Sequence, residues 1–305
     1  DCDVLIVGLG PVGAATAALL AQQGVDCIAI DKDEAVYPLP RAAHFDHEIM
    51  RLFQQLGLSD TVLEHSRPAP AYEFRSADGQ LLLNFPSLES GSPSGWASGY
   101  MFNQPAIEHA LRAKLDQSDF VQTRLNWRFK SLIEDAEGIS AAVITPAGET
   151  VIRARYLIGC DGAHSPVRDA MGIKLLDLEF DEPWLVIDAV VKNPELMPTV
   201  NLQICDPARP TTCVLMGEGR HRWEFMILPG ETAEQVSDDA FIEQLLEPWN
   251  VQGAVRLERI EPAHQHIKQP VARRLTLGGD GAIQHLRITR ADLAPVRDGG
   301  LADVE

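Results

Sequence analysis

The 305-residue chain has few basic residues and no long apolar run. It contains 26 Lys and Arg against 44 Asp and Glu, and the formal net charge of −18 argues against a nucleic acid or an anionic membrane surface as the main partner. No stretch approaches the roughly 20 apolar residues that a membrane-spanning helix needs, and the N-terminus enters a strand pattern without a leader. We therefore expect a soluble, cytoplasmic protein that binds neither nucleic acid nor membrane.

The chain also lacks the cysteine patterns of a zinc site or a disulfide framework. Its five cysteines are scattered, with no C-x-x-C pair and no Cys/His spacing that suits zinc. His264 and His266 could share a metal in principle, but no third ligand has a supporting spacing. A reducing compartment and no metal site are the expectation.

The first 31 residues follow the order strand, glycine turn, helix, strand. Residues 3–8 (DVLIVG) form a short β-branched run, typical of a parallel strand that is buried on both faces. The Ala-rich residues 12–23 predict a helix that ends at Gly24, and residues 26–30 predict the second strand. This order indicates a right-handed βαβ unit.

The glycines of this unit form the motif Gly8-x-Gly10-x-x-Gly13, and Asp31 stands 18 residues beyond Gly13. In a dinucleotide site the first glycine allows the turn, the second admits a pyrophosphate and the third lets helix and strand pack, while the acid accepts from a ribose hydroxyl. The alternative is that small residues merely pack the turn. The candidate cofactor-binding residues here are Gly8, Gly10, Pro11, Val12, Gly13, Asp31 and Lys32.

Periodicity and turn residues predict the elements that follow. We expect helices at residues 47–56, 105–115 and 233–246. We expect strands at residues 72–75, 81–85, 127–134, 140–145, 150–153, 154–159, 185–191, 200–204, 211–216, 223–228, 255–260 and 275–279. The fold class is therefore α/β, a doubly wound Rossmann-like domain with an inserted β-rich lobe.

Two further motifs follow apolar strands. Asp161 and Gly162 open a segment that continues to Arg168, and Gly279 precedes Asp280. Each has a simpler interpretation, because Ser165 before a proline is a good helix N-cap and Gly-Asp is common in turns.

In this order the three motifs resemble the fingerprint set of the class A flavoprotein monooxygenases. Residues 40–58 (PRAAHFDHEIMRLFQQLGL), 102–112 (FNQPAIEHALR), 204–210 (ICDPARP) and 222–232 (RWEFMILPGET) are similar to the branch that contains 3-(3-hydroxyphenyl)propionate hydroxylase. The resemblance implies an FAD-binding domain of the glutathione-reductase type, with FAD and NAD(P)H as cofactors. It places Arg41, Gln104, Asp161, Gly162, Arg168, Gly279 and Asp280 among the cofactor-binding residues.

The resemblance also implies an activity, the hydroxylation of a small phenolic substrate with NAD(P)H and O₂. A larger polyketide or quinone-like ring is an alternative substrate, and a flavin-binding module without turnover is an alternative of another class. No catalytic side chain is assigned. One of Arg209, Arg220 and Arg222 could bind a substrate carboxylate. Oligomeric state is left open, with a homodimer as one alternative.

The resemblance divides the chain into two parts. Residues 1–70, 101–180 and 265–305 are expected to bind FAD, and residues 71–100 and 181–264 to form the β-rich substrate domain. After Asp280 the sequence departs from the family pattern, retaining Ala282 and His285 in kind. Three alternatives stay open: a truncated or frame-shifted product, a sequence from which residues are omitted, and a true variant. If these 305 residues are the whole polypeptide, weak FAD binding and NAD(P)H oxidation without hydroxylation are expected.

Overall fold

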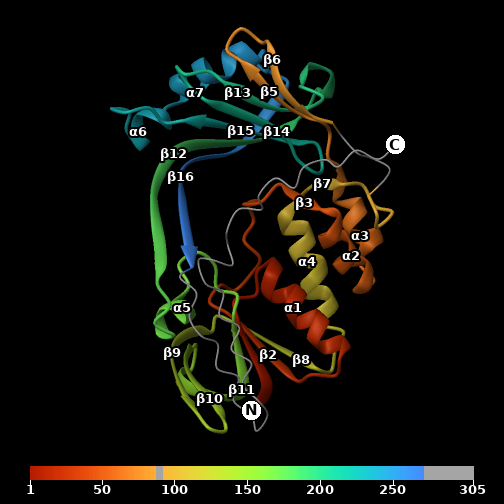
Figure 1. Cartoon of the computed structure of the whole chain (residues 1–305), viewed down its shortest axis with the longest axis vertical. Helices are drawn as coiled ribbons and strands as arrows, with labels where there is room; N and C mark the ends of the chain where they lie inside the picture. The colour runs from red at the N-terminus through yellow and green to blue at the C-terminus, as the bar shows by residue number, and fades with distance from the viewer. Residues whose placement is uncertain (87–91, 271–305) are drawn as a thin grey trace, which may run out of the picture.

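Two sheets lie at opposite ends of the molecule (Figure 1), joined by the long strands β12 (Leu175–Val191) and β16 (Val255–Pro270). The structure, a computed structural model, describes residues 1–86 and 92–270, except for the side chains of residues 177, 179–181 and 264–270. Within these residues no helix is long and apolar enough to cross a bilayer. Within the same limits, no cluster of His, Cys, Asp and Glu is arranged to hold a metal.

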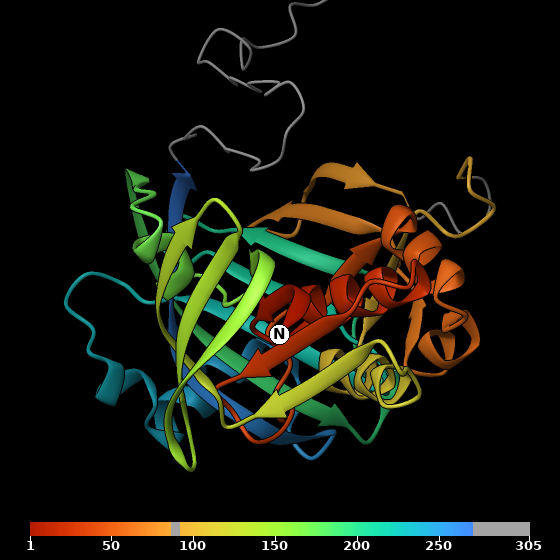
Figure 2. The same cartoon turned by 90° about the horizontal axis from the view of Figure 1, so that it is seen from below.

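The six-stranded sheet contains the βαβ unit, and its strand order is β8-β2-β1-β11-β10-β9. Its strands are β1 (Cys2–Val7), β2 (Cys27–Asp31), β8 (Val121–Leu125), β9 (Arg128–Asp135), β10 (Gly138–Thr145) and β11 (Gly148–Gly159). The four strands from β8 to β11 are parallel, and β11, β10 and β9 are antiparallel. Figure 2 shows them from below, with β9 and β10 (yellow-green) at the edge away from β8 (yellow).

Strand β1 is buried on both faces, as its sequence predicts. Val4 and Ile6 face the core beneath the helices α1 (Pro11–Gln22) and α4 (Gln104–Leu115). Leu5 and Val7 face the second core, with residues of β9, β10 and the short helix α5 (Pro166–Ala170). The period of two thus gives each face of the strand its own hydrophobic core.

Strand β11 is a single strand of 12 residues, although the sequence analysis divides it into two. It pairs with β10 up to Ala154 and with β1 from Ala154 onward. A change of partner within one strand leaves no turn residue in the sequence, so the continuity was not predictable.

A small sheet of order β3-β7-β4 lies between the two large ones. It consists of β3 (His44–Asp46), β4 (Ser66–Pro68) and β7 (Gly99–Phe102), next to the helices α2 (His47–Gln55) and α3 (Ser59–Glu64). Helix α2 was predicted, whereas α3 and the three strands were not. Strands of three or four residues are too short for a periodic signal.

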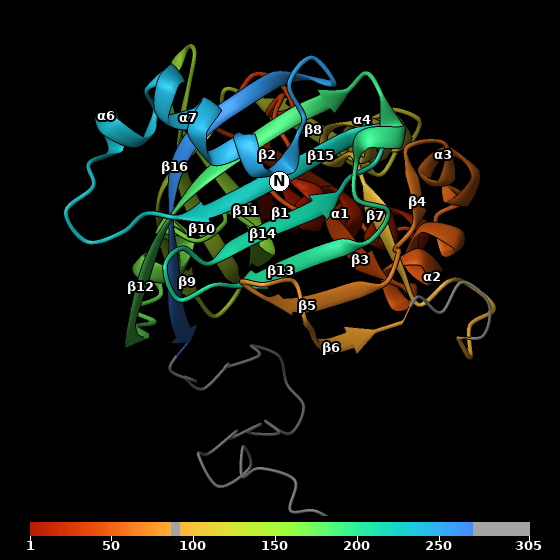
Figure 3. The same ribbon diagram turned by 90° about the horizontal axis from the view of Figure 1, so that it is seen from above.

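The seven-stranded sheet has the order β16-β12-β15-β14-β13-β5-β6, with only β13 and β5 parallel among its pairs. Its other strands are β5 (Tyr72–Ser76), β6 (Leu81–Phe85), β13 (Asn201–Cys205), β14 (Thr211–Leu215) and β15 (Arg220–Met226). Figure 3 shows this sheet from above. Its core centres on the fully buried Trp223.

Helices cover the outer face of this sheet, where the sequence analysis expects one helix over residues 233–246. The structure has α6 (Ala233–Val236), α7 (Asp239–Leu246) and the 3₁₀ turns η1 (Pro194–Leu196) and η2 (Glu247–Trp249). The single helix is wrong because Asp238 caps α7, accepting a hydrogen bond from the Ala240 N–H at 3.0 Å. The expected strand at residues 275–279 lies outside the described residues.

Candidate functional site

Two of the three motif glycines are required by packing at the carboxyl ends of β1 and β11. Gly8 has a φ of +98°, and a Cβ there would lie 2.3 Å from the Cys160 carbonyl oxygen. A Cβ on Gly13 would lie 1.8 Å from the Gly8 carbonyl oxygen. The Cys160 N–H donates to the Val7 carbonyl at 2.7 Å, which holds the two strand ends together. Gly8 and Gly13 therefore allow strand, turn and helix to pack closely.

Gly10 is different, because a Cβ at this position would have no neighbour within 4 Å. It is the N-cap of α1, where no side chain caps the helix, Pro11 is the first helical residue and the side chain of Val12 is exposed. Open space in front of a helix N-terminus suits a pyrophosphate, whose charge is stabilised by the helix dipole and N–H groups. The residues present thus fit the phosphates of a dinucleotide.

Asp31 lies at the end of β2, and its carboxylate is held in place beside this turn. Oδ2 accepts a hydrogen bond from the Leu9 N–H at 2.8 Å, and Oδ1 accepts one from the Asp33 N–H at 3.0 Å. Arg112 on α4 places Nη2 3.7 Å from Oδ2 and donates to the Leu9 carbonyl at 3.0 Å. Since each carboxylate oxygen has two lone pairs, Asp31 retains acceptor capacity for a ribose hydroxyl. Lys32 follows with an exposed side chain.

The Asp161 motif forms the start of a helix. Asp161 Oδ2 accepts from the Val167 N–H at 2.9 Å, and its Oδ1 accepts from the Ser165 hydroxyl. Ser165 caps α5, as the sequence predicts, by accepting from the Arg168 N–H at 3.0 Å. Arg168 donates to the Ala163 carbonyl at 2.8 Å, and Gly162 has a φ of +84°. These bonds stabilise the turn, and cofactor contact by Asp161, Gly162 and Arg168 stays a prediction.

Gln104 holds the backbone of Arg41 from one side. Its Oε1 accepts from the Arg41 N–H at 2.9 Å and from the Ala42 N–H at 2.6 Å. Its Nε2 donates to Glu108 at 2.7 Å, so the buried amide is bonded at both ends. Gln104 therefore positions the Arg41 segment, and direct contact with FAD stays a prediction.

Arg222 on β15 holds the same segment from the other side. It donates from Nη1 to the Arg41 carbonyl at 2.9 Å and from Nη2 to the Pro40 carbonyl at 2.6 Å. The Pro40 carbonyl also accepts from Arg259 at 3.0 Å. The backbone of residues 40–42 is thus bonded from both sides, by α4 and by the seven-stranded sheet.

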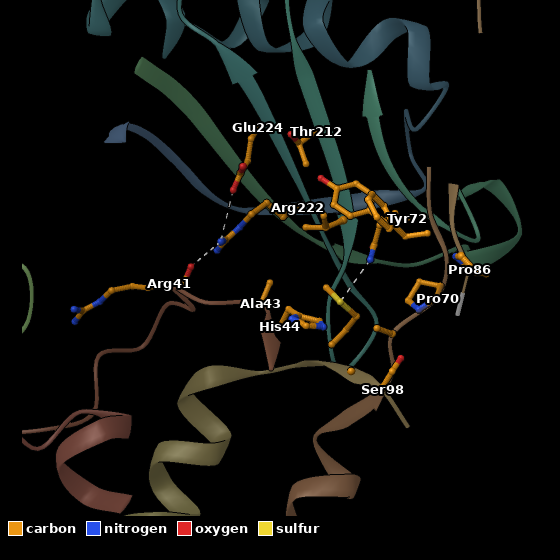
Figure 4. Close-up of a pocket in the computed structure, with 16 residues that line it drawn as sticks. Arg41, Ala43, His44, Pro70, Tyr72, Pro86, Ser98, Thr212, Arg222 and Glu224 are labelled. Atoms are coloured by element: carbon orange, nitrogen blue, oxygen red, sulfur yellow. Dashed lines mark hydrogen bonds and ion pairs between the residues drawn. The ribbon is translucent and has the colours of Figure 1, made fainter. Parts of the chain in front are cut away.

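A cavity of about 620 Å³ lies between the seven-stranded sheet and the small sheet (Figure 4). This volume is typical of small-molecule sites. In Figure 4 the side chain of Arg41 extends away from the other lining residues, and its guanidinium stacks on Tyr37 with 4.8 Å to the ring centroid. The polar and charged lining residues include Arg41, His44, Tyr72, Thr212, Arg222 and Glu224.

Polar side chains gather on one wall of the cavity. Burial raises the pKa of Glu224, and nearby Arg222 lowers it less strongly. Burial and the neighbouring Glu224 carboxylate raise the pKa of Tyr72, whereas a hydrogen bond with Thr212 lowers it. The wall therefore presents a phenol that stays protonated and a carboxyl group that readily accepts or holds a proton.

None of the three arginines proposed for a substrate carboxylate is free of a protein partner. Arg209 pairs with Glu231, Arg220 with Glu218 and Glu258, and Arg222 with Asp188. Only Arg222 lines the cavity. Glu224 and Arg112 were not predicted as site residues, because no motif or spacing marks them.

Gly279 and Asp280, the last predicted cofactor-binding residues, lie outside the described residues. All other candidates are described, and they fall into two groups. The glycine turn, Asp31, Asp161, Gly162 and Arg168 lie at or beyond the carboxyl ends of β1, β2 and β11, whereas Arg41 and Gln104 lie beside the cavity.

One family profile, described as FAD binding domain, matches residues 1–279. The chain belongs to this family. This agrees with the resemblance that the three motifs suggested and with the fold class. The glycine turn and Asp31 lie within the matched residues, and their contact with a dinucleotide stays a prediction.

Among curated relatives, the 3-(3-hydroxy-phenyl)propionate/3-hydroxycinnamic acid hydroxylase of Mycolicibacterium smegmatis is 34% identical over 285 residues, which is 92% of this chain and 50% of the relative. A probable NADH-specific resorcinol 4-hydroxylase of Rhodococcus jostii is 35% identical over 77% of this chain and 44% of its own length. The chain thus spans about half the length of the curated relatives it matches.

Among solved structures, p-nitrophenol 4-monooxygenase PnpA of Pseudomonas putida superposes with a TM-score of 0.77 at 19% identity, over 90% of this chain and 70% of that one. Aklavinone-11 hydroxylase with FAD and aklavinone has a TM-score of 0.75 at 23% identity, over 89% and 55%. At these identities the likeness shows the fold.

Proposed function

We propose that the chain is the FAD-binding and substrate-binding part of a monooxygenase that hydroxylates a phenolic ring with NAD(P)H and O₂. The observation that carries the proposal is the cavity beside residues 40–42, which the resemblance places near the flavin. Its wall combines apolar residues with Tyr72 and Glu224, a combination suited to a phenol. The relatives named as hydroxylases of phenolic acids and resorcinol support the same reaction.

The chain's residues would divide the work. The turn at Gly8, Gly10 and Gly13 would bind the pyrophosphate of FAD, and Asp31 would accept from its adenosine ribose. The bound flavin would supply the redox chemistry and the activation of oxygen. The cavity would orient the ring and exclude water.

The division of the chain into residues 1–70, 101–180 and 265–305 for FAD and residues 71–100 and 181–264 for the substrate belongs to the same proposal. It is supported by strands β5 and β6, which join the seven-stranded sheet although they precede it by about 90 residues in the chain. All five cysteines are free thiols, which supports a cytoplasmic location. A homodimer stays open.

The test is to supply the purified full chain with FAD and measure the oxidation of NADH and of NADPH with and without phenols. Faster oxidation together with a hydroxylated product is the expected result, and the Gly10→Val variant should lose both. Stoichiometric FAD without a hydroxylated product from any phenol would instead establish a flavin-binding module without turnover.

A further inference from the structure

Glu224 is the one carboxylate, among the described residues, that lines the cavity, and it lacks a close ion pair. Its nearest cationic atom is Arg222 Nη1, 3.9 Å away. Arg222 makes its shorter contacts elsewhere, with Asp188 at 2.7 and 3.0 Å and with the carbonyls of residues 40 and 41. The charge of Arg222 is therefore largely balanced by Asp188, and Glu224 is left to interact with the contents of the cavity.

The described part of the cavity wall offers no cation to a negatively charged ligand. The Arg41 guanidinium extends away and stacks on Tyr37. Desolvation lowers the pKa of His44, so this imidazole is neutral near pH 7. The guanidinium of Arg222, the remaining basic residue, is already paired with Asp188.

Glu224, Tyr72 and Thr212 together form a polar wall. Thr212 on β14 is the cross-strand partner of Glu224 on β15, and Tyr72 on β5 lines the same cavity. The Glu224 carboxylate raises the pKa of Tyr72, and a hydrogen bond with Thr212 lowers it. The other lining residues are mainly apolar, as suits an aromatic ring: Ala43, Ala69, Pro70, Phe85, Pro86, Met101 and Val214.

We propose that Glu224 is a substrate-binding residue whose carboxyl oxygen accepts the phenolic O–H, and that the cavity selects uncharged phenols over phenols that carry a carboxylate. The proposal rests on the proposed function and specifies the charge of its substrate. The proposed preference differs from the relatives' names, which contain two phenols that carry a carboxylate.

Two physical effects produce the selection. A carboxylate that leaves water without a cationic partner loses its hydration and gains no ion pair. When Glu224 is ionised, the ligand's carboxylate is also repelled by a like charge in a site of low dielectric. A phenolic O–H meets neither cost, and the hydrogen bond to an ionised acceptor favours its binding.

The experiment compares two ligands that differ in charge and little in shape, 3-(3-hydroxyphenyl)propionate and its methyl ester. Their binding to the full chain with FAD and without NAD(P)H is measured by calorimetry at pH 7.5. The ester should bind at least about tenfold more tightly than the acid. In Glu224→Gln this ratio should fall but stay above one, because only the like-charge repulsion is removed, and in Glu224→Lys it should invert. Glu149→Gln, which removes an exposed carboxylate paired with Lys130, is the matched control and should keep the wild-type ratio.

The role of Glu224 at the phenolic hydroxyl has its own readout. Methyl 3-phenylpropionate, which lacks the hydroxyl, should bind the wild type and Glu224→Gln equally, whereas the hydroxylated ester should bind the variant more weakly. Circular dichroism checks that both variants fold. If Glu224→Lys does not fold, the binding ratio of Glu224→Gln alone tests the proposal.

The outcomes separate this inference from the proposed function. If the acid binds as tightly as the ester and phenols are still hydroxylated, the inference is overturned and the function stands. A ratio that stays at its wild-type value in Glu224→Gln also overturns it. If neither ligand binds and no phenol is hydroxylated, the proposed function fails and the inference fails with it.

Discussion

Arg222 and Asp188 form a buried, two-bonded ion pair where the seven-stranded sheet meets residues 40–42. Nε donates to Oδ1 at 2.7 Å and Nη2 to Oδ2 at 3.0 Å, and the two side chains are 6% and 2% exposed. Because Arg222 also donates to the Pro40 and Arg41 carbonyls, the pair fixes residues 40 and 41 to β12 and β15. It joins the proposed flavin and substrate regions.

Removing one member of this pair should cost much of the protein's stability. Arg222→Met keeps the side-chain volume but leaves Asp188 buried without its main partner, which typically costs about 3–5 kcal/mol. Urea unfolding measures the loss. Lys130→Met is the matched control, since its pair with Glu149 is half exposed and should contribute less than about 1 kcal/mol. Equal losses in the two variants would contradict the role of the buried pair.

The glycines of the turn should separate folding from cofactor binding. Gly10→Val adds a side chain into open space, so the melting temperature should change little while FAD binding is lost. Gly13→Val places a Cβ against the Gly8 carbonyl oxygen and should lower the melting temperature itself. Thermal unfolding without FAD, followed by FAD titration, distinguishes the two. A Gly10→Val protein that retains stoichiometric flavin would show that the pyrophosphate binds elsewhere.

Asp31→Ala should weaken FAD binding, because a charge-assisted hydrogen bond to the ribose contributes about 1.5–3 kcal/mol. The variant also loses the bond to the Leu9 N–H, so part of the effect comes from a less ordered turn. Asp33→Ala, with an exposed side chain two residues further on, is the control and should bind FAD as the wild type does. An FAD titration in which both variants match the wild type would exclude the ribose contact.

The sequence was sufficient to predict the first βαβ unit, because its apolar run, glycines and acid are local signals. The sequence was not sufficient where the bounds of a strand depend on its pairing with a distant strand rather than on a local pattern. Strand β12 was predicted from residue 185, yet it begins at Leu175, because its charged first half is held by β16, about 90 residues away in the chain. The break before α7 has a local signal, because Asp238 is a good N-cap, although apolar residues continue at helical spacing beyond it.

The site shows the same limit. Spacing alone predicts the candidate residues Gly8, Gly10, Gly13 and Asp31. The position of Arg222 depends instead on hydrogen bonds to Asp188, 34 residues away, and to carbonyls more than 180 residues away. Glu224 is set apart by its place in the wall of a cavity that strands of two sheets enclose. Neither property has a signature in the sequence.

The last prediction concerns His221, a buried imidazole on β15 that stacks on Trp223 with 5.9 Å between ring centroids. Burial lowers its pKa to about 4, against about 6.5 in an unfolded chain. Between these values the unfolded chain binds a proton that the native protein does not, so the free energy of unfolding should fall as the pH falls from about 6.5 toward 4. From pH 7.5 to pH 5 the contribution of this residue is about 2 kcal/mol.

Urea unfolding at both pH values, compared between the wild type and His221→Phe, isolates this contribution. The comparison is needed because Glu108 and Glu224, whose pKa values are raised by burial, act in the opposite direction and gain protons in the native state first. The phenylalanine keeps a ring against Trp223 and removes the titration, so the variant should lose about 2 kcal/mol less than the wild type on acidification. His109→Gln, a change at an exposed site on α4, retains His221 and should follow the wild type. If His221→Phe and the wild type lose the same stability between pH 7.5 and pH 5, the imidazole is protonated in the folded protein at pH 5. Its burial is then not the cause of the lower stability in acid.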